Sequence, residues 1–233
     1  VRRGDPRKAH EDARKLRRCA DQLREATYMS ESLNRFDRNI QRVDNLCNLF
    51  EQAKASPKRP TVKEADILRA AVVFLHSALE DYLRGILSDL LPQIGDEAAI
   101  NGIALIDTQD RPEKFYMGKL LPYKDKTVAS LISDSVRQHM KKVSFNDVTD
   151  IASWLKKISV SLNDFHDHES VNTMIKRRHK IVHEADNNQN SGQGNHFAAS
   201  INLQTVKAWE TSVVNLVNSI EAQLAAMDRE RIK

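Results

Sequence analysis

The chain is poor in the residues that β folds, disulfide scaffolds and membrane proteins require. Its 233 residues include only 7 Gly, 6 Pro and 2 Cys. A β-sandwich or barrel needs frequent turns, so the scarcity of Gly and Pro favours helices. No apolar run approaches the roughly 20 residues of a membrane span. The basic N-terminus lacks the apolar stretch of a secretory signal. These absences predict an all-α protein of the cytoplasm with no membrane partner.

Residues that would mark a metal, cofactor or covalent site are also missing. Cys19 and Cys47 are not in metal-ligand spacing, and we interpret them as thiols in a reducing compartment. No Gly-rich phosphate loop is present, and no Ser or Cys nucleophile stands in a known setting. We therefore expect no cofactor. The chain begins at Val1 rather than at methionine, so its first residues are interpreted as a product of cleavage or expression.

The charge balance permits an anionic partner without requiring one. The net charge is +4 and the pI about 9.0, and the basic excess is concentrated in the first 24 residues. Such a run is either a solvated helix face or an arm that contacts phosphates. The sequence leaves both interpretations open.

Apolar periodicity predicts a long N-terminal helical segment. Residues of about 8–55 read as one very long helix or two consecutive helices with a heptad-like seam. The seam contains Leu33, Phe36, Ile40, Val43, Cys47 and Phe50. Such a face needs a partner, which is either the later helices of the chain or a second subunit. We expect residues 1–56 to form this segment, as a dimerisation or partner arm, and residues 60–233 to form a helical domain with an irregular insert at 95–126.

The strongest core helix is predicted from Thr61 to Leu91. Thr61 and Glu64 form a capping box pattern at its start, and Pro92 is expected to end it. Glu80 lies among leucines on this helix, and a buried carboxylate needs a cation. We predict Arg178 as that cation, with Arg84 at i+4 as the alternative. His76, one turn earlier, is interpreted as a satisfied core histidine.

Four further helices follow from capping residues and apolar spacing. They are predicted from Thr127 to Lys142, from Asn146 or Asp147 to Ser161, from about 168 to Asp186, and from Asn202 onward. Residues 187–200 are expected to be a flexible polar loop.

The segment from Arg177 to His183 carries the most informative pattern. Spacing of three and four places Val171, Ile175, Arg178 and Val182 on one stripe that is apolar except for the arginine. Arginine keeps its proton, so Arg178 must be paired or must line a polar cleft. His183 follows five residues later, a rotation of roughly 140°. It must therefore lie at an irregular helix end or reach the cleft from its flank.

Zinc binding is the weaker interpretation of the same segment. His179 and His183 share a helix face, and His166 and His168 lie upstream. However, the metalloprotease pattern requires Glu directly after the first histidine, where this chain has Lys180. A lysine ammonium beside a cation site is unfavourable, so we expect no metal.

Arg178 and His183, separated by four residues with the polar His179 directly after the arginine, resemble the RX4–6H motif of HEPN domains. The apolar helix around Glu80 is similar to the glutamate-bearing helix of the RiboL-PSP branch. The resemblance covers roughly residues 62–91 and 148–227. It implies an all-α HEPN-like bundle. It also implies a homodimeric, metal-independent ribonuclease that leaves 2′,3′-cyclic phosphate ends. Such enzymes often serve as toxins or anti-phage effectors, which an antitoxin or other regulatory protein can control.

The residue types fit this chemistry. His183 can act as general base or acid near neutral pH. The planar guanidinium of Arg178 matches the oxygens of a phosphorane. One histidine cannot easily make both proton transfers, and a two-fold dimer would bring two copies of each group into one cleft. Supporting roles are expected for Glu80, His179 and Arg177, and RNA contacts for Lys176 and Lys180.

The alternative to catalysis is a HEPN module that binds protein, nucleotide or RNA without cutting. The long N-terminal segment would then be its partner surface.

Overall fold

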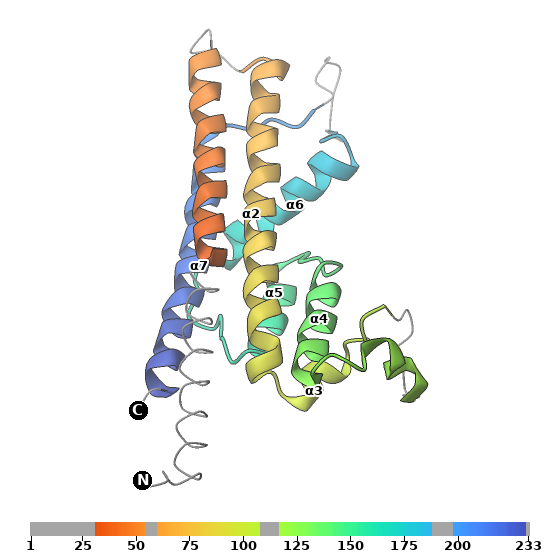
Figure 1. Ribbon diagram of the computed structural model, residues 1–233. Helices are drawn as coiled ribbons and strands as arrows, with labels where there is room; N and C mark the ends of the chain where they lie inside the picture. Colours follow the sequence, from red (N-terminus) through yellow and green to blue (C-terminus); the bar gives the residue numbers. More distant parts are fainter. Residues whose placement is uncertain (1–30, 55–59, 108–116, 188–197, 232–233) are drawn as a thin grey trace, which may run out of the picture.

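The computed structural model describes residues 31–54, 60–107, 117–187 and 198–231 (Figure 1). Within these ranges every regular element is a helix, and turns or loops connect the helices; the structure also has one isolated β-bridge between Asn187 and Ala198. The predicted all-α fold is confirmed. The helices are 31–53, α2 (Val62–Ile94), α3 (Glu97–Asn101), the 3₁₀ helix η1 (Met117–Tyr123), α4 (Val128–Met140), α5 (Val148–Lys156), α6 (His168–His183) and α7 (Leu203–Arg231).

Local capping chemistry fixes where most helices begin. The Thr61 hydroxyl accepts from Glu64 N, and the Glu64 carboxylate accepts from Thr61 N at 2.6 Å, so the predicted capping box is confirmed. The Thr127 side chain accepts from Ser130 N at the start of α4, and the Asp147 side chain accepts from Asp150 N at the start of α5. The Asn202 side chain accepts from Thr205 N at 2.8 Å at the start of α7. Each cap satisfies N–H groups that have no partner inside the helix.

Helix ends were predicted less well. The expectation that α2 ends before Pro92 is wrong, because the helix continues through the proline to Ile94. A proline removes a single N–H donor, and in the last turn little of the helix remains to be disrupted. Helix α5 ends at Lys156 rather than near Ser161, since Ser159 adopts a left-handed φ of 63°.

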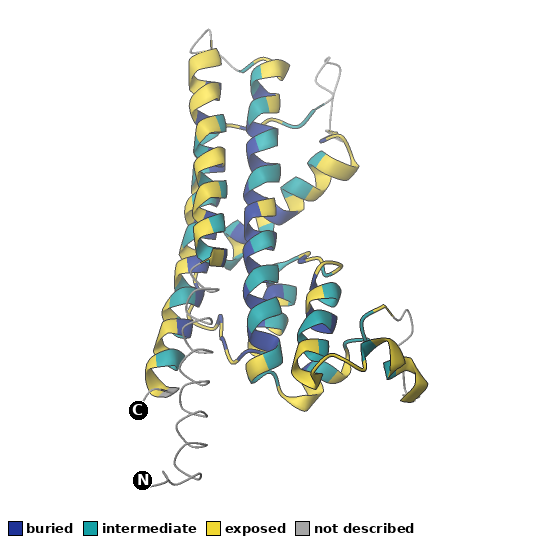
Figure 2. Cartoon of the chain, in the orientation of Figure 1, coloured by how far each residue is buried: buried dark blue, intermediate teal, exposed yellow. Residues whose placement is uncertain are grey.

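Helix α2 is the central element of the bundle. It contacts α4, α6 and α7, and buried positions recur along much of its length (Figure 2). Helix 31–53, α2 and α7 run along the long axis, and α6 lies obliquely against α2 (Figure 1). Within the described residues, no helix is both long enough and apolar enough to cross a membrane.

Helix 31–53 packs into the same core as the later helices. Phe36, Val43 and Phe50 are buried in it, and Arg35 forms an ion pair with Asp81 of α2 at 3.1 Å. This part of the predicted seam therefore has its partner within the chain. Residues 1–30 lie outside the described residues, so the partner arm stays a prediction, as does the domain boundary near residue 56. The same holds for most of the polar loop at 187–200.

Gly85 allows helix 31–53 to approach α2 closely. A Cβ atom at this position would lie 2.4 Å from Ser32 Oγ and 3.2 Å from Ser32 Cβ. Ser32 is itself buried, so a larger side chain at position 85 would have to separate the two helices.

We expect Gly85→Leu to lower the free energy of unfolding by about 2 kcal/mol, because overpacking a tight contact typically costs about 1–3 kcal/mol. Urea denaturation would measure the change. Gly102→Leu is the matched control, since a Cβ atom at Gly102 meets nothing within 4 Å. Equal midpoints for the two variants would contradict the close approach.

Candidate functional site

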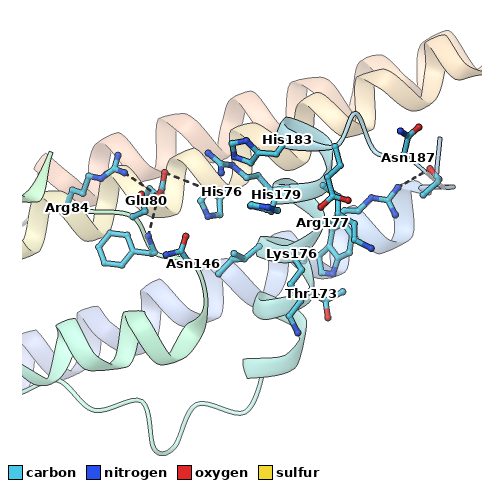
Figure 3. A pocket seen from close by; sticks show the side chains of 18 residues that line it. His76, Glu80, Arg84, Asn146, Thr173, Lys176, Arg177, His179, His183 and Asn187 are labelled. Atoms are coloured by element: carbon cyan, nitrogen blue, oxygen red, sulfur yellow. Dashed lines mark hydrogen bonds and ion pairs between the residues drawn. The ribbon is translucent and has the colours of Figure 1, made fainter. Parts of the chain in front are cut away.

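The last turns of α6 open onto a pocket of about 1050 Å³. Side chains of α2 and the loop before α5 form the opposite wall (Figure 3). The pocket brings together all the site residues that the sequence singles out. They are Arg178, His183, Glu80, His179, Arg177, Lys176 and Lys180.

His183 is the last residue of α6, as the 140° offset from Arg178 required. Both residues line the pocket. His179, one turn earlier, lies beside His183 with ring centroids 4.6 Å apart and the ring planes tilted by 44°. Both imidazoles are exposed, so two titratable rings face solvent at the cationic side of the pocket.

Arg178 is half-buried, and its Nε atom is buried without a hydrogen-bond partner among the described residues. The prediction that Glu80 is its ionic partner is wrong. Glu80 pairs with Arg84 at 3.2 Å, which was the alternative. The same oxygen of Glu80 accepts from Phe145 N at 3.5 Å. Since Arg84 and Phe145 N hold one oxygen of this carboxylate, the Arg178 guanidinium is left for the pocket.

The apolar stripe of α6 is shorter than predicted. Val171 and Ile175 are buried, but Val182 is 47 % exposed. The last turn of α6 extends away from α2 (Figure 1), so Val182 does not reach the core that buries Val171 and Ile175. Arg178 therefore lies at the transition from core to surface.

His76 is buried, as predicted, but it is not a satisfied core histidine. Its Nδ1 atom has no hydrogen-bond partner among the described residues, and the ring lines the pocket. Burial lowers the pKa of His76 below its ordinary value, and the Arg178 and Arg84 charges lower it further. Glu80 and the Phe145 backbone oppose this shift. We infer that the ring is neutral at neutral pH.

Asp186 joins three parts of the chain. Its carboxylate accepts from Arg69 Nε of α2 at 2.7 Å and from an Nη of Arg177 on α6 at 2.8 Å. Both arginines also donate to the Ala199 carbonyl, just before α7. The Asp186 side chain is 2 % exposed, so it is a buried anion held by two cations.

Asp186 also takes part in the turn that ends α6. Asp186 N donates to Lys180 O at 3.0 Å, and Ala199 N donates to Asp186 O at 2.8 Å. Ala185 and Asp186 adopt left-handed φ angles of 51° and 54°. The helix therefore ends at His183, not at Asp186 as predicted, and the turn that follows is fixed by hydrogen bonds on both sides.

Sequence reasoning missed several residues of the site. Arg69 lies 117 residues before Asp186, and no local pattern connects them. The loop residues Ser144, Phe145 and Asn146 also line the pocket without any motif to mark them. A buried histidine one turn before a buried glutamate was a usable signal for His76.

The zinc alternative finds no ligand set in the described part of the chain. No group of three or more His, Cys, Asp or Glu residues there is arranged to hold a metal ion. His179 and His183 thus lack a third ligand of these types among the described residues.

We expect Asp186→Asn to lower the free energy of unfolding by about 3 kcal/mol, because it leaves two partly buried arginines without their anion. The matched control is Asp66→Asn. Asp66 pairs with the same Arg69 at 2.9 Å, but its side chain is 62 % exposed, so the change should stay within about 0.5 kcal/mol. Similar losses for both variants in urea denaturation would contradict the buried role of Asp186.

His76 should make the protein less stable in acid. The unfolded chain takes up a proton at this histidine below about pH 6.5, and the folded chain does so only at lower pH. The free energy of unfolding should therefore fall as the pH drops below about 6.5, by up to about 1.4 kcal/mol per pH unit. His76→Gln should reduce this slope in urea denaturation between pH 7.5 and 5. Parallel slopes would exclude His76 as the source.

Comparison with known proteins identifies the family. The model of the RiboL-PSP-HEPN family matches residues 35–226, which is most of the chain and includes α2, α6 and the Arg178–His183 segment. A search of curated proteins and a search of solved structures each gave no match. The fold, the motif helix and the family match agree, and the chain belongs to the RiboL-PSP-HEPN family of HEPN domains.

Proposed function

We propose that the protein is a metal-independent endoribonuclease that cuts single-stranded or loop RNA. Family membership supports an RNA-related or nuclease module in general. The observation that carries the finer proposal is the pocket itself, onto which Arg178 and the exposed His183 both open. The Arg178 Nε atom has no hydrogen-bond partner among the described residues. Lys176 and Lys180 are exposed at the same wall and would contact neighbouring phosphates.

The proposed reaction is an in-line attack by the ribose. His183 takes the proton from the 2′-OH, and the 2′ oxygen attacks phosphorus. The guanidinium of Arg178 stabilises the charge that develops on the phosphorane oxygens. The bond from phosphorus to the 5′ oxygen then breaks, and a protonated imidazole gives that oxygen its proton. The products are a 2′,3′-cyclic phosphate and a 5′-hydroxyl. Unstacked nucleotides reach this geometry most easily, which favours single strands and loops.

The second imidazole is proposed to come from a homodimer. His183 lies at the exposed end of α6, where a two-fold related copy could approach it. His179, in ring contact with His183, would hold the catalytic ring in place. An enzyme of this kind would act on cytoplasmic RNA as a toxin or anti-phage effector, under the control of an antitoxin or regulatory protein.

Cleavage of an unstructured RNA in excess EDTA tests the proposal. Wild-type protein should cut and leave cyclic phosphate ends. His183→Ala should lose roughly 10²–10⁴ in rate, the typical contribution of a general acid or base. Arg178→Lys should also be impaired, since lysine keeps the charge but not the planar fork.

His166→Ala is the matched control, because His166 is exposed and does not line the pocket. Its rate should equal that of the wild type. Loss of activity with chelator would refute the metal-independent mechanism. RNA that is bound but left intact by the wild-type dimer would favour the non-catalytic module instead.

A further inference from the structure

The two walls of the pocket have different chemistry (Figure 3). The α6 wall is cationic, with Lys176, Arg177, Arg178 and Lys180. At the far wall, Glu80 and Arg84 neutralise each other at 3.2 Å, and the neutral residues Ser144 and Asn146 lie beside them. A phosphate fits the first wall. At about 1050 Å³ the pocket has the size of a small-molecule site, so room remains for the rest of a nucleotide.

Two acceptor atoms at the far wall make no hydrogen bond with the described residues, and one of them, His76 Nδ1, is fully buried. Arg84 and Phe145 N both contact Oε1 of Glu80, so Oε2 is left with His76 Nδ1 at 3.7 Å, which exceeds hydrogen-bond length. The Glu80 and His76 residues are 9 % and 2 % exposed. His76 Nδ1 has no partner among the described residues. A buried hydrogen-bond acceptor without a donor costs free energy, so this wall suits a ligand that donates hydrogen bonds.

We propose that the Glu80–His76 wall is a nucleobase subsite that selects a base with an exocyclic amine, such as cytosine or adenine. The proposal rests on the proposed ribonuclease function and names the base that the pocket would accept beside the phosphate on the α6 wall. Phosphate oxygens do not fit the Glu80–His76 wall, because they are hydrogen-bond acceptors and would face Glu80 Oε2 and His76 Nδ1, which are acceptors too. Uracil does not fit either, since it has a carbonyl where cytosine has its amine.

One amine can satisfy both acceptors. Its two hydrogens can point separately to Glu80 Oε2 and His76 Nδ1, because hydrogen bonds of about 2.9 Å from one nitrogen can span the 3.7 Å between these atoms. Arg84 and Phe145 N hold the carboxylate in place from its other oxygen, so the acceptor is oriented before the base arrives.

Binding of CMP and UMP to the full-length chain tests the subsite by calorimetry, without any need for cleavage. The two ligands share their phosphate and sugar and differ at the base edge. CMP should bind about tenfold more tightly than UMP. In Glu80→Gln, Arg84 and Phe145 N would hold the amide oxygen at the Oε1 position, which places the NH2 group at the Oε2 position. That donor suits the uracil carbonyl, so the preference should vanish or reverse.

Glu184→Gln is the matched control, since Glu184 lines the same pocket from its exposed α6 end. It should keep the CMP preference. Equal binding of CMP and UMP by the wild type would overturn the subsite, and so would a preference that survives in a folded Glu80→Gln. A chain that prefers CMP but cuts no RNA keeps the subsite and loses the ribonuclease proposal. A chain that cuts RNA in EDTA but binds both nucleotides equally keeps the ribonuclease proposal and refutes the subsite.

Discussion

The ion pairs that Asp186 makes with Arg69 and Arg177 are the interaction on which the rest of the site depends. They tie the end of α6 to α2 and to the segment that enters α7. An anion this deeply buried is stable only while both cations and their hydrogen bonds are in place. The direction in which α6 leaves the bundle, and with it the position of His183, follows from this contact.

Two adjacent arginines on α6 consequently have different tasks. Arg177 is occupied by Asp186 and by the carbonyls of Ala199 and Ser200. Arg178 points to the pocket and has no such partners among the described residues. Successive residues on a helix differ by about 100° in direction. One turn of α6 can therefore direct Arg177 to Asp186 and Arg178 to the pocket.

Local signals in the sequence predicted the parts of the fold that depend on local chemistry. The Thr61–Glu64 capping box and the Asn202 cap are hydrogen bonds between near neighbours, and both were found. The spacing of Arg178 and His183 required His183 to lie at a helix end or to reach the cleft from its flank, and His183 is the last residue of α6. The pairing of Arg69 with Asp186 spans 117 residues and depends on tertiary packing, which no periodicity encodes. For the same reason the choice between Arg84 and Arg178 as the partner of Glu80 could not be made from the sequence.

Helix α2 also sets the distance between the Asp186 ion pairs and the far wall of the pocket. Arg69, which holds Asp186, and Glu80, on the opposite wall, are eleven positions apart on one uninterrupted helix, a rise of about 16 Å. A helix cannot lengthen gradually, since a single inserted residue would turn everything after it by about 100°. Glu80 and His76 would then face elsewhere while Arg69 stayed in place. Within the family, the stretch between these two positions should therefore vary in residue type but not in length. Substrate preference should then change through substitutions of side chains at constant spacing along the helix.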